Sequence, residues 1–80
     1  MKLNIVLFGI AKDIAGTSRI DMEVEEKATI ANFKTKLINR FPEMEKLASL
    51  AFAVDTEYVN DDYVLRENEE VVIIPPVSGG

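Results

Sequence analysis

Hydrophobic residues form two nearly unbroken runs, one toward each end of the chain. Residues 2–10 carry apolar side chains at both alternating sets of positions, and residues 71–74 do the same. Strands covered on both faces have this pattern, because neither set of side chains meets water. The runs therefore predict two central strands that are covered on both sides.

A third segment alternates instead. In residues 19–24, apolar side chains at the even positions are separated by charged side chains at the odd positions. This alternation predicts a half-exposed strand near an edge of the sheet. Residues 11–18, which precede it, are predicted to be a connection with at most one helical turn, broken at Gly16.

One helix is predicted in the middle of the chain. Apolar side chains recur every three or four residues at Ile30, Phe33, Leu37 and Phe41, which places them on one helix face. Thr29 is the expected N-cap, and Pro42 ends the pattern because proline disfavours helix in the residue before it. Residues 43–49 contain at most one further turn.

The remaining short elements follow this helix. Residues 50–54 are predicted to form a strand, residues 55–57 a turn and residues 58–59 a short return strand. Residues 63–65 are expected to be extended. In the polar loop of residues 66–70, Asn68 suits the left-handed backbone conformation.

These elements predict an α+β fold. If the unbroken runs mark central strands, the first and last strands lie side by side in the middle of the sheet, and the helix packs across one face. This is the β-grasp layout of ubiquitin-like proteins, with a mixed sheet of about four to five strands and one main helix. We assign residues 1–75 to the β-grasp domain and residues 76–80 to a flexible C-terminal Gly-Gly tail.

Composition narrows the possible functions. The 80 residues include 9 Lys and Arg against 14 Asp and Glu, a net charge of −5, which argues against nucleic-acid binding. The absence of Cys and His removes the usual nucleophiles, general bases and metal ligands, so we expect no side-chain catalysis and no metal site. No apolar run reaches the roughly 18 residues that span a bilayer, and a cytoplasmic protein is expected.

The chain ends in the sequence PPVSGG. Two prolines stop the last strand, and Gly79 and Gly80 are slender enough to enter a narrow channel with a free carboxylate at the end. A carboxylate accepts a nucleophile only after activation, usually by adenylation. We therefore interpret this carboxylate as the reactive group; the alternative is an ordinary frayed terminus. Because the chain has no phosphate-binding loop, it is expected to bind no cofactor, and a partner would use the ATP.

A family resemblance follows from these residues. VVIIPPVSGG, preceded by the polar turn RENEE and joined to an opening apolar strand and AKDIAGTS, is similar to the MoaD/ThiS family of ubiquitin-like sulfur carriers. The likeness covers essentially the whole chain. One departure is Asn68, where the family often has glycine.

The resemblance implies a role as the small subunit of molybdopterin synthase. An enzyme related to the ubiquitin activators would adenylate Gly80, a sulfur donor would convert it to a thiocarboxylate, and the tail would deliver sulfur to cyclic pyranopterin monophosphate in the large subunit. Besides Gly79 and Gly80, it implies a set of partner-binding residues. These are Lys12, Tyr58, Ile74, Pro75, Pro76, Val77 and Ser78.

Other interpretations remain open at this point. Lys12 could be a solvated loop residue, Tyr58 a half-exposed strand residue and Ile74 a core residue. The chain could carry sulfur for thiamine or tRNA thiolation, or it could be a protein modifier joined to lysines. It could also be a β-grasp interaction domain that makes no use of its terminus.

Overall fold

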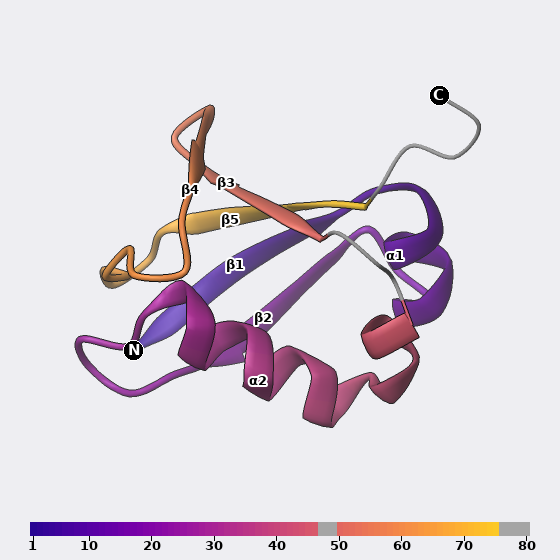
Figure 1. Ribbon diagram of the computed structural model, residues 1–80, viewed down its shortest axis with the longest axis horizontal. Helices are drawn as coiled ribbons and strands as arrows, with labels where there is room; N and C mark the ends of the chain where they lie inside the picture. Colours follow the sequence, from indigo (N-terminus) through magenta and orange to yellow (C-terminus); the bar gives the residue numbers. More distant parts are fainter. Residues whose placement is uncertain (47–49, 76–80) are drawn as a thin grey trace.

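The described part of the computed structural model, residues 1–46 and 50–75, contains one mixed five-stranded sheet in the order β2-β1-β5-β3-β4 (Figure 1). Its elements are β1 (Lys2–Leu7), α1 (Gly9–Ala15), β2 (Arg19–Glu23), α2 (Ile30–Arg40), the 3-10 helix η1 (Pro42–Lys46), β3 (Ala51–Val54), β4 (Glu57–Val59) and β5 (Glu70–Ile74). β1 and β5 pair in parallel, and the other neighbours pair antiparallel. The predicted central pair of first and last strands and the predicted edge strand β2 are therefore confirmed.

Helix α2 begins at a capping box. The Thr29 hydroxyl accepts a hydrogen bond from the Asn32 backbone N–H at 3.2 Å, and the Asn32 side chain accepts one from the Thr29 N–H at 3.0 Å. Each bond satisfies a backbone donor that the helix itself leaves unpaired. The predicted N-cap is confirmed, and the helix ends at Arg40, just before Phe41 and Pro42.

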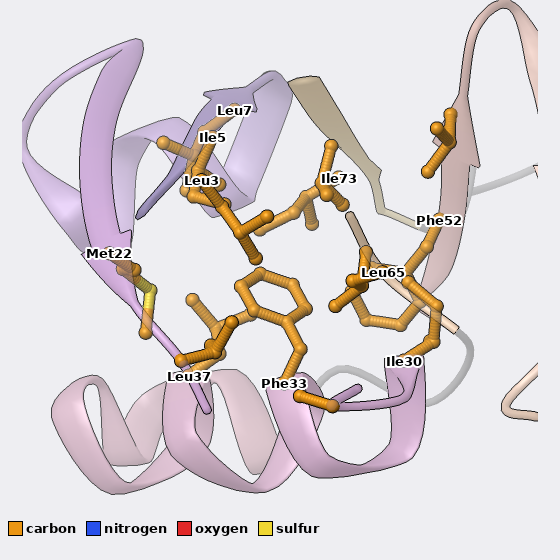
Figure 2. Packing of buried hydrophobic residues seen from close by; sticks show 14 of the residues in the cluster. Leu3, Ile5, Leu7, Met22, Ile30, Phe33, Leu37, Phe52, Leu65 and Ile73 are labelled. Carbon is orange, nitrogen blue, oxygen red and sulfur yellow. The ribbon is translucent and has the colours of Figure 1, made fainter. Parts of the chain in front are cut away.

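The apolar stripe of α2 packs against one face of the sheet and forms the core. Figure 2 shows the ring of Phe33 pointing from the helix toward the strands. Ile30, Phe33 and Leu37 have no exposed surface. The Phe33 ring meets Phe52 of β3 edge to face, with ring centroids 5.8 Å apart and an interplanar angle of 83°. This geometry favours contact between the positive edge of one ring and the negative face of the other.

The first strand is shorter than predicted. β1 ends at Leu7, and Gly9 begins α1, so the last part of the predicted strand is helical. Gly9 has a φ of 54°, which turns the chain out of the sheet, and Gly16 ends the helix with a φ of 78°. The Gly16 N–H donates to the Lys12 carbonyl oxygen at 2.8 Å. The predicted break at Gly16 is confirmed, but the helix before it is longer than one turn.

Two predicted turns contain residues with a left-handed backbone. Asp55 and Thr56 have φ values of 52° and 66° and join β3 to β4 in a tight hairpin. Asn68 has a φ of 63°, as predicted. The predicted extended segment at residues 63–65 was only partly right, because it makes a single β-bridge, between Val64 and Thr29, and lies outside the strands of the sheet. None of the helices in the described ranges is long and apolar enough to cross a membrane.

Candidate functional site

The face of the sheet opposite α2 carries a continuous apolar surface. Residue pairing places Val6, Val72, Ala53 and Tyr58 in one row across β1, β5, β3 and β4. Neighbouring strands lie about 4.8 Å apart, so this row is about 14 Å long. Ile74 lies two positions after Val72 on β5, and Phe8 follows β1 in an extended conformation, with a φ of −127° and a ψ of 160°, so both side chains lie on the same face. We call the six residues the open-face patch: Val6, Phe8, Ala53, Tyr58, Val72 and Ile74.

This surface is not part of the core. Val6 and Ala53 retain only 8% and 7% exposure, yet neither belongs to the cluster of buried residues around α2. Tyr58 is 72% exposed and Phe8 is 54% exposed. Across residues 1–46 and 50–75, no helix is laid over this face, since α2 covers the other one and α1 sits at the end of the sheet (Figure 1). The prediction that both central strands are covered on both sides was therefore wrong for this face.

The same face is charged beyond the patch. Lys2 and Asp21 form an ion pair at 3.6 Å, and Arg19 and Glu70 form another at 3.5 Å. All four side chains are more than half exposed, so these pairs contribute little to folding. The register places Lys2, Asp21 and Glu70 toward the start of β1, whereas the apolar rows lie toward its end. Arg19 pairs with Val6 and therefore borders the apolar row at the β2 edge. The open face thus has an apolar half and a charged half, which meet at Arg19.

The apolar half borders the point where the chain leaves the sheet. Because β1 and β5 are parallel, Leu7 pairs with Ile73, and the residues that follow each strand lie at the same end. A Cβ atom added to Gly9 would lie 3.3 Å from Cγ of Pro75, so the start of α1 is in contact with the last described residue. The open-face patch and the base of the C-terminal segment are therefore neighbours.

Four of the predicted site residues fall within the described chain, and all lie at this end of the molecule or on this face. Tyr58 and Ile74 belong to the open-face patch, and Ile74 is half-buried there, outside the core that its alternative interpretation required. Lys12 is exposed on α1, where its N–H donates to the Phe8 carbonyl oxygen at 3.3 Å. Pro75 is half-buried beside Gly9. The other five predicted residues, Pro76, Val77, Ser78, Gly79 and Gly80, lie outside the described residues.

Four members of the patch were not predicted as site residues. Val6, Phe8, Ala53 and Val72 belong to apolar runs, which suggested burial on both faces. The sequence nevertheless contained a signal that one face of the sheet is open. The sequence predicts only one long amphipathic helix, and one helix covers one face of a sheet. The second apolar face therefore had no predicted element to cover it.

The described part of the site has no cluster of carboxylates. In the part of the chain that the structure describes, no group of three or more Asp or Glu side chains could hold a metal ion. The hydrogen bond from the Tyr63 hydroxyl to Glu69 raises the pKa of the tyrosine, and partial burial adds to the shift. This tyrosine packs against the core from the loop before β5, so its bond is structural. What the described site offers is an apolar contact surface beside Pro75.

Comparison with known proteins gives matches over nearly the whole chain. The sequence profile of the ThiS family matches residues 5–80. A molybdopterin synthase sulfur carrier subunit from Dictyostelium discoideum is 31% identical to this chain over 83 residues, which cover 99% of this chain and 96% of that protein.

Solved structures share the fold. Subunit 1 of a molybdopterin converting factor from Pyrococcus furiosus superposes with a TM-score of 0.88 and 22% identity, covering 96% of this chain and 99% of that chain. A chain in the complex of subunits 1 and 2 of the molybdopterin-converting factor from Helicobacter pylori gives a TM-score of 0.71 with 20% identity, and the match covers 100% of both chains. The predicted β-grasp fold is confirmed.

Proposed function

The chain belongs to the ThiS family, and from this premise we propose that it is a sulfur carrier and the small subunit of molybdopterin synthase. Its relative in Dictyostelium discoideum is named a molybdopterin synthase sulfur carrier subunit, and the two align over nearly their whole lengths. The carrier role requires a free C-terminal carboxyl group and a surface by which larger enzymes hold the domain.

The observation that carries the proposal is the position of the open-face patch. It borders Pro75, the residue from which the C-terminal Val-Ser-Gly-Gly sequence continues after one further proline. A protein that docks on the patch would hold the domain with its terminus close to the docked surface. Exposed aromatic and aliphatic side chains of this kind are common anchors in protein interfaces.

The proposed chemistry takes place at the main-chain carboxylate of Gly80. This carboxylate attacks the α-phosphate of ATP, which forms an acyl-adenylate and releases pyrophosphate. A donor of sulfur at the oxidation level of sulfide then displaces AMP and leaves a thiocarboxylate. In the synthase, the thiocarboxylate sulfur bonds to a side-chain carbon of cyclic pyranopterin monophosphate and displaces an oxygen substituent, and water hydrolyses the resulting thioester to restore the carboxylate. Each loaded chain delivers one sulfur atom.

The partners supply the binding sites for ATP and for the pterin. An adenylating enzyme of the ubiquitin-activator type binds the ATP, and the large subunit of the synthase binds the pterin. Glycine at the last two positions suits passage into a narrow active site, because it carries no side chain. The absence of Cys also means that no thiol of the carrier can intercept the activated acyl group.

We further propose that the open-face patch docks the large subunit. Phe8 and Tyr58 would enter apolar pockets, and Lys12 on α1 would pair with an acidic group at the rim. In this arrangement the charged half of the face, including Lys2 and Asp21, would remain outside the contact or at its edge. The same patch is available to the adenylating enzyme, so the two partners would bind in succession.

Reconstitution of the synthase tests the proposal. The chain is prepared with a C-terminal thiocarboxylate by thiolysis of an intein fusion, then mixed with the large subunit from the same organism and cyclic pyranopterin monophosphate. Molybdopterin, measured as its fluorescent oxidised derivative, is expected from the thiocarboxylate and absent with the ordinary carboxylate. Failure of the thiocarboxylate to form molybdopterin in a stable complex would contradict the proposal.

The same protein preparation separates the alternatives. Transfer of its sulfur to a thiamine precursor or to tRNA, without molybdopterin formation, would reassign it to another thiolation pathway. Isopeptide bonds between Gly80 and lysines of many unrelated proteins would make it a modifier. Full function with a blocked C-terminus would leave only the role of an interaction domain.

A further inference from the structure

We infer that Gly9 is a positioning residue, which sets the direction in which the chain leaves the sheet at Pro75. The inference rests on the proposed function, because the direction matters only if Gly80 must reach an active site. Gly9 is the first residue of α1, and Pro75 directly follows β5. The parallel pairing of β1 and β5 brings them together.

The two residues fit closely. A Cβ atom on Gly9 would lie 3.3 Å from Cγ of Pro75, which is shorter than an ordinary van der Waals contact. The Pro75 ring is joined to the backbone at both N and Cα, and its φ is fixed at about −65°, so beyond a small change of ring pucker the ring moves only together with the backbone. The missing side chain of Gly9 therefore leaves space for the Pro75 ring, and any side chain at Gly9 would displace the ring or the start of α1.

A second glycine, Gly16, allows the effect of this contact to be distinguished from the effect of a left-handed backbone. Gly16 also has a left-handed φ, of 78°, but nothing lies within 4 Å of a Cβ atom added there. Gly16 is thus required only for its φ, whereas Gly9, with a φ of 54°, is required for its φ and for the space it leaves. Replacement of either glycine by alanine carries a similar backbone penalty, but only the Gly9 variant changes the contact with Pro75.

A shift of Pro75 displaces the base of the segment that ends in Gly80. Five residues follow Pro75, and a chain of that length extends up to about 17 Å. A misplacement of about 1 Å at a reacting centre can slow a reaction by about a hundredfold. The Gly9 contact would therefore affect the transfer step, while the open-face patch would still bind the large subunit.

The test uses four variants of the full chain: G9A, G16A, P75A and the double variant G9A/P75A. Each is loaded with a thiocarboxylate by thiolysis, and sulfur transfer to cyclic pyranopterin monophosphate is followed in the complex with the large subunit. We expect G9A to lower kcat by about tenfold or more with little change in KM for the carrier. G16A should keep the wild-type kcat despite a similar loss of stability. The effect of G9A should shrink in the P75A background, because alanine lacks the Cγ atom.

Two results would overturn the inference. One is an equal loss of kcat in G9A and G16A, which would indicate destabilisation alone. The other is an undiminished effect of G9A in the P75A background, which would show that Pro75 does not transmit it. If G9A fails to fold, Gly9→Asn replaces it, because asparagine tolerates positive φ better than alanine.

A second measurement keeps the inference separate from the proposed function. If the wild-type thiocarboxylate transfers no sulfur, the proposed function fails, and backbone amide chemical shifts of Val77 to Gly80 then decide the positioning role. G9A should shift these resonances, G16A should leave them in place, and P75A should reduce the response to G9A. Unchanged resonances in G9A would refute the inference.

Discussion

Val6 and Tyr58 lie in one row of paired residues across the open face, with Val72 and Ala53 between them. The first is nearly buried by its neighbours, with 8% exposure, and the second is 72% exposed at the edge of the sheet. The row connects a strand near the middle of the sheet with the edge strand β4. It gives the molecule an apolar surface with an accessible tyrosine at its edge, which is a suitable geometry for docking.

Truncation of the exposed members of the patch should weaken partner binding without unfolding the domain. Because Phe8 and Tyr58 are mostly exposed, F8A and Y58A should each change the free energy of unfolding by less than about 1 kcal/mol. Each should raise the Kd for the large subunit by about tenfold or more, as expected for an aromatic anchor. Isothermal titration calorimetry measures the Kd.

Val64 provides the matched control for these variants. It is 50% exposed but lies outside the patch, in the bridge with Thr29. V64A should bind the large subunit with the wild-type Kd. Equal weakening by V64A and Y58A would mean that the patch is not the docking surface.

Phe33 should be the least replaceable aromatic residue in the core. F33A removes a fully buried ring and its edge-to-face contact with Phe52. The expected loss is about 3–5 kcal/mol, which approaches the whole stability of a small domain. Urea unfolding should therefore show a largely unfolded protein, whereas a midpoint close to that of F8A would contradict the packing described here.

The capping box of α2 makes a smaller, separable contribution. T29A removes the hydroxyl that accepts the Asn32 N–H and should lower the free energy of unfolding by about 1 kcal/mol. Thr35 is the control, because its hydroxyl only donates to the Ala31 carbonyl oxygen inside the helix. T35A should be neutral or slightly stabilising in urea unfolding. A larger loss in T35A than in T29A would disagree with the capping geometry.

The bond between Tyr63 and Glu69 should make part of the stability depend on alkaline pH. The Tyr63 hydroxyl donates to Glu69 Oε2 at 2.7 Å, and this bond raises the pKa of the tyrosine. The neutral tyrosine is thus favoured in the folded state. Its contribution is fully present below the ordinary tyrosine pKa of about 10 and is lost as the pH rises through the higher pKa of the folded state.

Comparison of wild type with Y63F measures this contribution. At neutral pH, Y63F should be less stable by about 1 kcal/mol, the usual value of one hydrogen bond. The difference in the free energy of unfolding should shrink at pH values above about 10, where the unfolded tyrosine ionises. A difference that stays constant across this range would show that the bond does not produce the shift.

The arrangement of the fold was largely predictable because the decisive features are local. The spacing of Ile30, Phe33 and Leu37 fixes the helix face, and Thr29 marks its start. The start of α1 was missed because the apolar run continues through Phe8 and Ile10. A single positive φ at Gly9 ends the strand, and hydrophobic patterning does not report it.

The candidate site was less predictable because it lies on a face of the sheet that no helix of the described residues covers. Apolar residues such as Val6 and Val72 look the same in a sequence whether a second layer covers them or not. The presence of one long amphipathic helix signals an open face only indirectly, and the strand order and the position of α2 show which face is open. The contact between Gly9 and Pro75 joins residues from opposite ends of the chain, and no sequence pattern links them.

The central claim is that the carboxylate of Gly80 carries the sulfur, and intact mass spectrometry tests it most directly. The chain is incubated with ATP, its adenylating enzyme and sulfide, beside a chain that lacks Gly80 as the control. We predict a mass gain of one oxygen-to-sulfur exchange, located at Gly80 by fragmentation and absent from the control, with the melting temperature of both chains alike. An unchanged mass, or a gain located at a side chain, would contradict the account.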